Sequence, residues 1–268
     1  GDKHNDTLAI VVTLYNEDVD ELKKTLASLL NTVAIDGVHM KILLVFDGVR
    51  DKKGAFIIPE CTRQYLTQLF PVLGDWSRFC APGLQEQKSD SESQAHYFKK
   101  TTVVPRELAT GNCAIATQLK KRTDIDVSLL IKQSNRQKTN SLEWGFRFGY
   151  EIGCKWIFFT DVGTMYDEDC LGHLVQCLKR NPHTAGCTST QRALPMSLDW
   201  QSMDAAGKPP AEIKLMAYYL RMLQVYEVEA QNPTSRAISS FLGFMPVLSG
   251  PGAMYNFGVL NARRKDIF

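Results

Sequence analysis

Three carboxylates in the sequence, Glu17, Asp47 and Asp161, each follow closely on a short apolar run. Such runs, rich in β-branched and aromatic residues, are typical of buried strands that lead into loops. In open α/β sheets, ligands bind beyond the carboxyl ends of the strands. Carboxylates gathered there would suit a ligand with hydroxyl or imide groups, or a hard cation such as Mg²⁺ or Mn²⁺.

Each of these features also has a structural explanation. Asp47 precedes Gly48, a common turn pair, and Asp161 could likewise end its strand in a turn. Glu17 could support the first turn of the helix that follows it. The basic residues around Asn135, including Lys138, could form a solvated loop. The combination of these residues, in this order after successive strands, favours a ligand site.

Alternating strands and helices must position these residues. The expected strands are 8–15, 40–46, 127–132, 156–160 and 185–190, and the expected helices are 19–33, 62–70, 140–150, 167–180 and 213–229. The first strand, helix and strand form a βαβ unit, which predicts a parallel sheet with a right-handed crossover. The sequence therefore predicts an α/β fold with a mostly parallel sheet and flanking helices.

The same patterns predict where individual side chains lie. Asp18 and Asp167 are expected to cap their helices, with Val33 and Tyr150 on the buried faces of theirs. Seven cysteines at wide spacings, without a Cys-x-x-Cys pair, indicate reduced thiols and a cytosolic compartment. Cys170 and Cys177 are expected on one helix face, where buried thiols are common.

Composition limits the classes of function. The 268 residues carry a net charge of +2 and are 44% hydrophobic, which excludes a disordered chain and makes nucleic acid an unsuitable main partner. No apolar run reaches the length of a membrane span and the first residues are polar, so we expect a soluble chain without a signal peptide. We expect one domain over 1–268, with an insertion loop at 74–93. The sequence contains no P-loop, and no dinucleotide fingerprint follows the first strand, which argues against kinases, P-loop ATPases and Rossmann dehydrogenases.

Four segments of the sequence, in order, resemble motifs of chitin synthases, which are inverting family 2 glycosyltransferases. Residues 12–17 (VTLYNE) resemble the first motif, and 135–144 (NRQKTNSLEW) the stretch that ends in Asn-Ser-x-x-Trp. Residues 159–164 (FTDVGT) are similar to the Asp-Val-Gly-Thr form of the metal-binding DxD motif. Residues 248–255 (LSGPGAMY) resemble the Gly-Pro segment, so the resemblance covers nearly the whole chain.

The resemblance implies a GT-A-like nucleotide-sugar-binding fold. It also implies transfer of N-acetylglucosamine from UDP-N-acetylglucosamine to the 4-hydroxyl of a growing chitin chain, with Mg²⁺ or Mn²⁺ as cofactor. The implied sites are nucleotide binding by Thr13, Tyr15, Glu17, Asp47, Asn135 and Lys138, metal binding by Asp161, and the acceptor side at Gly250 and Pro251.

The chain also departs from the family pattern. The Asp-Val-Gly segment offers one carboxylate where the general motif has two, so the cation would depend on phosphates and water as well. The family's general base and its Gln-x-x-Arg-Trp motif are expected beyond Phe268, so the catalytic residue is unknown here and the chain alone could be inactive. We expect the chain to be the donor-binding portion of a longer protein, truncated before those motifs. That protein would lie at the cytosolic face of the plasma membrane, attached through segments absent from this chain, and homo-oligomers are left open.

Alternative functions follow from these departures. A non-catalytic UDP-sugar-binding or regulatory module would keep the fold without turnover, and a structural interaction domain would not bind nucleotide. A cellulose- or hyaluronan-synthase-like β-glycosyltransferase is a further alternative. Individual residues have alternatives as well: Tyr15 could be a core aromatic, and Trp144 is favoured as a packing residue over a sugar platform.

Overall fold

The structure is a computed structural model of the chain. It describes residues 6–15, 17, 19–46, 49–50, 56–57, 86–88, 94–100, 125–132, 137–190, 219–220, 222–223, 225–226 and 251–262. The chain divides into two compact units, one of residues 1–187 and 253–268 and one of residues 188–252. The prediction of a single domain over 1–268 stays a prediction.

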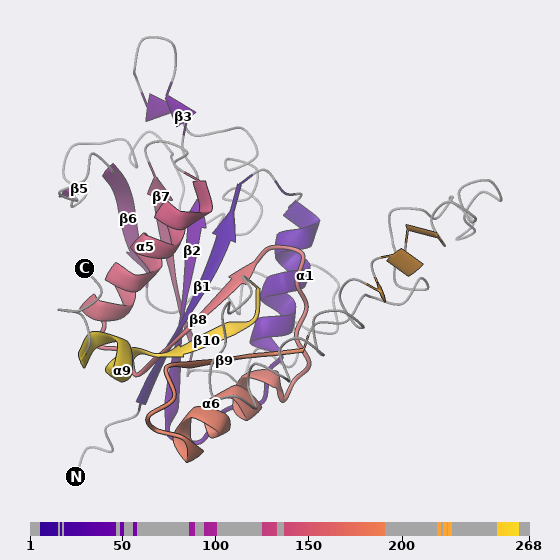
Figure 1. Ribbon diagram of the computed structural model, residues 1–268. Helices are drawn as coiled ribbons and strands as arrows, with labels where there is room; N and C mark the ends of the chain where they lie inside the picture. Colours follow the sequence, from indigo (N-terminus) through magenta and orange to yellow (C-terminus); the bar gives the residue numbers. More distant parts are fainter. Residues whose placement is uncertain are drawn as a thin grey trace. The chain divides into compact units, whose positions relative to one another are not determined.

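An eight-stranded sheet forms the first unit, in the order β5-β6-β7-β2-β1-β8-β10-β9 (Figure 1). Its strands are β1 (Asp6–Leu14), β2 (Val38–Phe46), β5 (Glu86–Lys88), β6 (Gln94–Lys100), β7 (Ile125–Lys132), β8 (Trp156–Asp161), β9 (Gly186–Thr188) and β10 (Ala253–Asn256). The central strands β7, β2, β1 and β8 are parallel, whereas β5, β6 and β10 pair antiparallel with their neighbours. Two short strands, β3 (Val49–Arg50) and β4 (Phe56–Ile57), form a separate sheet. The predicted α/β class, with parallel strands at the centre of the sheet, is confirmed.

Helices cover both faces of this sheet. Because successive side chains of a strand point to opposite faces, Leu8, Ile10 and Val12 of β1 pack on one side and Ala9 and Val11 on the other. The first side is covered by α1 (Val19–Leu30) and α6 (Cys170–Arg180), and the second by α5 (Gln137–Glu151) and α9 (Phe257–Ala262). The central strands are thus buried on both faces, which explains why they are continuous apolar runs.

Two glycines of helix α5 face the sheet, where there is no room for a side chain. A Cβ atom added at Gly145 would come within 2.6 Å of the Phe159 ring and 3.0 Å of the Val11 methyl groups. A Cβ atom at Gly149 would come within 2.9 Å of the Cys154 sulfur. The two glycines, one turn apart, therefore set the distance between this helix and the strands beneath it.

Two helix boundaries differ from the sequence prediction. Helix α1 ends at Leu30, and Val33 is 52% exposed, because the hydroxyl of Thr32 donates a hydrogen bond to the carbonyl of Leu29 and the chain leaves the helix there. Helix α6 begins at Cys170 rather than Asp167, since residues 168–169 form a turn, and its N-cap is Asp169 without a side-chain bond.

Two side chains expected to be buried are exposed. Tyr150 is 56% exposed, since it follows the buried pair Phe148 and Gly149 around the helix, and Cys177 points away from the apolar stripe of α6. The cysteines that the structure describes, Cys154, Cys170, Cys177 and Cys187, are free, in agreement with reduced thiols.

Several other predictions fall on residues outside the described ranges. They concern the helix at 62–70, most of the helix at 213–229, the cap Asp18, and the insertion at 74–93 apart from β5. Among the described residues, no helix is both long and apolar enough to cross a membrane.

Candidate functional site

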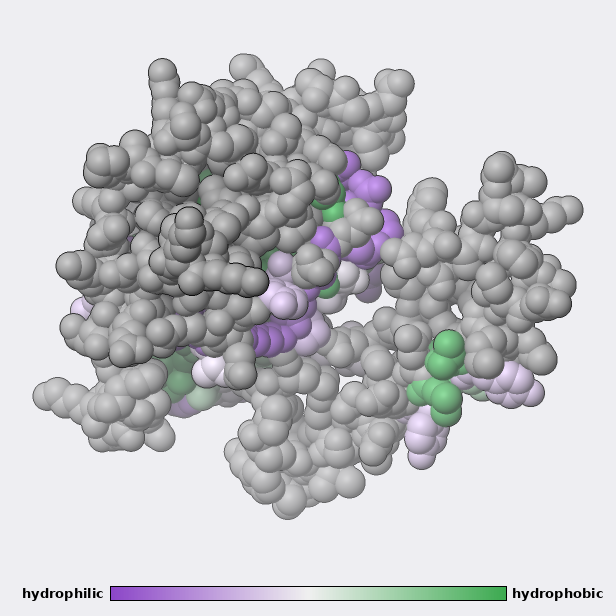
Figure 2. Space-filling model, turned by 90° about the horizontal axis from the view of Figure 1, so that it is seen from above, coloured by the Kyte–Doolittle hydropathy of each residue, from purple (hydrophilic) through white to green (hydrophobic). Residues whose placement is uncertain are grey.

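The connections between strands reverse direction beside β1. Helix α1 leads from β1 to its neighbour β2 across one face, whereas α5 leads from β7 across the other face to β8, on the far side of β1. Such a reversal opens a crevice beyond the carboxyl ends of the two strands between which it occurs, here β1 and β8. Figure 2 views the molecule from this side, where hydrophilic side chains of described residues reach the surface.

Thr13 and Asp161 meet at this point. They occupy the last paired position of the parallel strands β1 and β8 and lie on the face that α5 covers. The hydroxyl of Thr13 donates a hydrogen bond of 2.7 Å to Oδ1 of Asp161. Two residues 148 positions apart in the sequence are therefore joined by strand register.

Lys138 contacts the same carboxylate from another layer. It lies in the first turn of α5, which begins at the carboxyl edge of the sheet because it follows β7, and its ammonium donates to Oδ2 of Asp161. The side chains of Lys138 and Asp161 are 47% and 32% exposed. Thr13, Asp161 and Lys138, hereafter the carboxylate cluster, form a solvent-accessible polar group.

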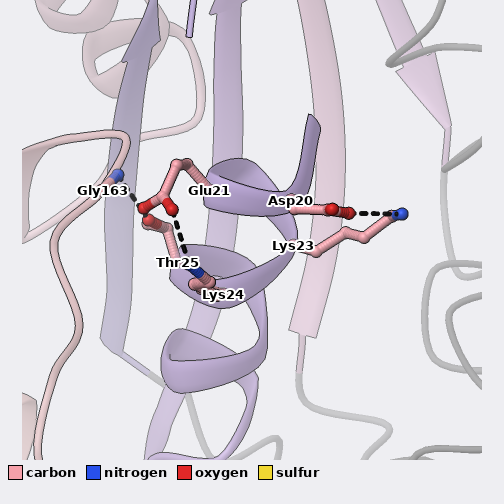
Figure 3. Close-up of polar contacts among 6 residues, drawn as sticks. All are labelled: Asp20, Glu21, Lys23, Lys24, Thr25 and Gly163. Atoms are coloured by element: carbon pink, nitrogen blue, oxygen red, sulfur yellow. Dashed lines mark hydrogen bonds and ion pairs between the residues drawn. The ribbon is translucent and has the colours of Figure 1, made fainter. Parts of the chain in front are cut away.

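The turn that carries Asp161 is held by α1 (Figure 3). Gly163 adopts a φ of +88°, a conformation that favours glycine, and its N–H donates a 3.0 Å hydrogen bond to Oγ1 of Thr25. Thr25 is fully buried, so this bond is shielded from water. Beside it, Glu21 forms an ion pair with Lys24 one turn along the helix.

A second contact holds the other side of the same segment. The hydroxyl of Tyr166 donates to Oγ1 of Thr160, whose side chain points to the face opposite that of Asp161. Burial raises the pKa of Tyr166 well above its usual value, so the phenol remains a neutral donor. Sequence reasoning missed Tyr166 and Thr25; a threonine among the buried leucines of an amphipathic helix is the signal that could have indicated Thr25.

Tyr15 and Glu17 lie at the end of β1. The side chain of Tyr15 is 60% exposed, so the core-aromatic interpretation is wrong. Oε2 of Glu17 accepts a 2.7 Å hydrogen bond from the backbone N–H of Tyr15. Glu17 therefore orders the end of the strand next to the carboxylate cluster.

The other residues predicted from the sequence for this site keep their roles as predictions. Asp47, Asn135 and Gly250 lie outside the described residues, and Pro251 belongs to the second unit. Trp144 is 2% exposed and packs in the core beneath α5, which agrees with its interpretation as a packing residue.

Asp161 is the candidate ligand for a divalent cation. Its carboxylate is a hard oxygen donor of the kind that Mg²⁺ and Mn²⁺ prefer, and its Oδ2 already binds a positive group, the ammonium of Lys138. Within the described part of the chain, no three His, Cys, Asp or Glu side chains are grouped to hold a metal. Asp161 therefore fits a cation as a single protein ligand that needs oxygens from a bound phosphate and from water.

Two of the solved structures to which this chain is similar both have TM-scores below 0.5. The mannosyltransferase PcManGT from Pyrobaculum calidifontis, in complex with GDP-Man and Mn²⁺, aligns over 95% of this chain and 46% of its own, with a TM-score of 0.47 and 12% identity. S. aureus TarS aligns over 98% of this chain and 50% of its own, with a TM-score of 0.41 and 12% identity.

Comparison of sequences identifies the family. Chitin synthase 2 of Cryptococcus neoformans var. grubii is 24% identical over 256 residues, and chitin synthase 1 of Phytophthora sojae is 23% identical over 278 residues. The alignments cover 93% and 97% of this chain but only 24% and 26% of those relatives, so the chain spans about a quarter of their length. Residues 8–266 match the sequence model of one family over nearly the whole chain, and the chain therefore belongs to the chitin synthase-like glycosyltransferase domain family.

Proposed function

We propose that the carboxylate cluster is the donor site for UDP-N-acetylglucosamine, and that the chain is the donor-binding part of an enzyme that adds N-acetylglucosamine to chitin. The observation that carries this proposal is the meeting of Thr13, Asp161 and Lys138 where the strand connections reverse. Family membership supports sugar transfer as the reaction class.

The residues of the cluster have chemistry suited to a nucleoside diphosphate. The ammonium of Lys138 and the positive end of the dipole of the 15-residue helix α5 would both favour phosphate oxygens. Asp161 would hold Mg²⁺ or Mn²⁺, which when bound supplies positive charge that offsets the charge of the departing diphosphate. Thr13 would keep Asp161 in place through its hydrogen bond.

The nucleoside would lie toward the ends of β1 and β2. The exposed ring of Tyr15 offers a flat apolar surface to a base, and Glu17 holds the backbone of Tyr15. From the resemblance, we assign contacts with uracil or ribose to Asp47 and a contact with the phosphates to Asn135.

The acceptor half of the reaction is also a proposal. Inverting transfer to the 4-hydroxyl of chitin requires a base that takes the proton of that hydroxyl. The resemblance assigns the base to the region beyond Phe268 and the acceptor side to Gly250 and Pro251. It further assigns the whole enzyme to the cytosolic face of the plasma membrane.

Calorimetric titration of the folded chain with UDP, with and without Mn²⁺, tests the donor site. We expect cation-dependent binding that weakens by about tenfold or more in Asp161→Ala, because the variant loses the only carboxylate of the cluster. The matched control is Asp6→Ala, since Asp6 is equally exposed at 32% and also pairs with a lysine, Lys155. The proposal would be contradicted if the folded wild-type chain did not bind UDP, or if both variants lost the same affinity for UDP.

The sugar is tested by competition between UDP-N-acetylglucosamine and UDP-glucose for the same site. We expect the N-acetylated donor to bind more tightly. Tighter binding of UDP-glucose would favour a cellulose-synthase-like enzyme instead, and equal binding would contradict specificity for the N-acetylated donor.

A further inference from the structure

We propose that Lys138 and the divalent cation compete for the same oxygen of Asp161, so that the cation binds tightly only when a diphosphate draws Lys138 away. This inference rests on the proposed function, because it assumes that the carboxylate cluster is the donor site. It assigns to Lys138 a second role, that of a counter-ion which keeps Asp161 neutralised while the nucleotide is absent.

The first argument is that both oxygens of Asp161 are engaged. Oδ1 accepts the hydroxyl of Thr13, and Oδ2 accepts the ammonium of Lys138. A divalent cation on Oδ2 would share that oxygen with a positive group already in contact with it. Two like charges at such a distance repel strongly where water screens them only in part, so they would not occupy this position together.

The second argument identifies which partner moves. Asp161 is the last residue of β8, its Oδ1 is bonded to Thr13, and the turn after it is held by the hydrogen bond from Gly163 to buried Thr25 (Figure 3). Lys138 reaches the carboxylate through a long side chain that is 47% exposed. The lysine can therefore swing to another acceptor while the carboxylate stays in position.

The third argument concerns the strength of the pair. Ion pairs that are partly exposed to solvent contribute little to stability because water screens them, so the contact between Lys138 and Asp161 is readily exchanged. A diphosphate offers more negative charge to the ammonium than one carboxylate does. Binding of the nucleotide would thus transfer Lys138 to the phosphates and leave Oδ2 open to the cation.

Competition predicts opposite effects of one substitution. In Lys138→Gln, the affinity of the nucleotide-free chain for Mn²⁺ should rise about fivefold, because the competing charge is gone. The affinity for UDP in the presence of Mn²⁺ should fall, because the phosphates lose a cationic partner. A lysine with a purely structural role would not strengthen cation binding when removed.

The experiment is a titration of the chain with Mn²⁺ alone, followed through the electron paramagnetic resonance signal of the free ion, and then a titration with UDP. The matched control is Lys155→Gln, which removes the lysine that pairs with Asp6 at the amino edge of the sheet. Lys138→Arg is a second variant, which retains the charge and should retain weak binding of Mn²⁺. Thermal unfolding confirms that each variant is folded.

Each outcome is decisive. Stronger Mn²⁺ binding in Lys138→Gln, with the wild-type value in Lys155→Gln, supports competition. An unchanged or weaker Mn²⁺ affinity in folded Lys138→Gln overturns it, while UDP binding by the wild type leaves the donor site intact. Failure of the wild type to bind UDP would reject the proposed function, and the Mn²⁺ titration would still decide the competition.

Discussion

Two Asp–Lys pairs lie at opposite ends of the neighbouring strands β1 and β8. At the amino edge of the sheet Asp6 pairs with Lys155, and at the carboxyl edge Asp161 pairs with Lys138. The residue types are the same, and both aspartates are 32% exposed. Their surroundings nevertheless give the two pairs different chemistry.

In the pair at the amino edge, one lysine binds both carboxylate oxygens and the backbone holds both residues. The ammonium of Lys155 contacts both oxygens of Asp6, at 2.9 and 3.0 Å, and lies 5.0 Å from the centre of the Trp156 ring. Both residues are also fixed by backbone bonds, from Asp6 to the carbonyl of Gly37 and from Lys155 to that of Thr7. This pair joins two strand ends.

The pair at the carboxyl edge is shared among three elements. Asp161 divides its oxygens between Thr13 of β1 and Lys138 of α5, and the lysine contacts only one of them. Under the proposed function, the two pairs have different roles although their residue types are the same, because only the pair of Asp161 and Lys138 lies where the strand connections reverse.

A substitution that disturbs the packing of α5 on the sheet should produce the largest difference between the two Asp–Lys pairs. In Gly145→Val the new side chain would meet the Phe159 ring and Val11, which should cost about 3 kcal/mol of stability through overpacking. Because α5 carries Lys138, UDP binding should weaken as well. The Asp6–Lys155 pair should be retained, since neither residue lies on α5. Chemical denaturation and calorimetry measure the two effects.

Gly172→Val in α6 is the matched control, because a Cβ atom at Gly172 meets nothing within 4 Å. It should be neutral or slightly stabilising, since valine has a better helix propensity than glycine. Equal stability of the two variants would show that Gly145 does not determine how α5 packs on the sheet.

Alkaline pH should lower the stability of the protein through a buried thiol beside the Asp6–Lys155 pair. Burial raises the pKa of Cys154, the residue before Lys155, from 9.0 to about 12, so the folded state favours the neutral thiol. The contribution of the neutral Cys154 thiol to the free energy of unfolding is complete below about pH 9. It is lost as the pH rises toward 12, at about 1 kcal/mol per pH unit, because the unfolded chain then releases a proton that the folded chain retains. Denaturation curves between roughly pH 8 and pH 11 measure this loss, because that range brackets the usual pKa of a thiol.

Cys187, whose pKa burial also raises to about 12, should contribute a similar loss. The variant Cys154→Ala should therefore lose stability less steeply with pH than the wild type does. Identical slopes would mean that the Cys154 thiol ionises equally in the folded and unfolded chain.

Loss of the Thr13 hydroxyl should produce the smallest effect. Thr13→Val keeps the shape of the side chain but removes the hydrogen bond to Asp161, which should weaken UDP binding with Mn²⁺ by about fivefold, or about 1 kcal/mol. Thr13→Ser should restore most of the affinity. If the serine variant binds as weakly as the valine variant, the methyl group rather than the hydroxyl is what matters.

Much of the fold could be predicted from local sequence. The apolar runs that form β1, β2, β7 and β8 were located to within two residues, because strands buried on both faces carry an unmistakable pattern. The prediction omits β6 and β10, each of which lies between a central strand and an edge strand of the sheet. β6 contains polar residues and β10 has four residues, so long-range pairing rather than local pattern places them in the sheet.

The candidate site could be predicted only in part. The sequence motifs identify Thr13, Lys138 and Asp161 as site residues. They give no reason to expect that the threonine and the lysine bind the same carboxylate. The sequence allows two interpretations of Tyr15, because an aromatic residue at a strand end is equally compatible with the core and with solvent. Its exposure depends on where the strand leaves the sheet.

The sequence by itself determined the strands and helices at the centre of the fold, the family, and the residue types that could bind a nucleotide sugar. Hydrophobic periodicity and motifs are local properties of the sequence, so they can be recognised without knowledge of the fold. Only the tertiary structure decided that Asp161 meets Thr13 and Lys138 at one edge while Asp6 meets Lys155 at the other. Those contacts depend on strand order, register and the face to which each side chain points, which arise from pairing between distant segments.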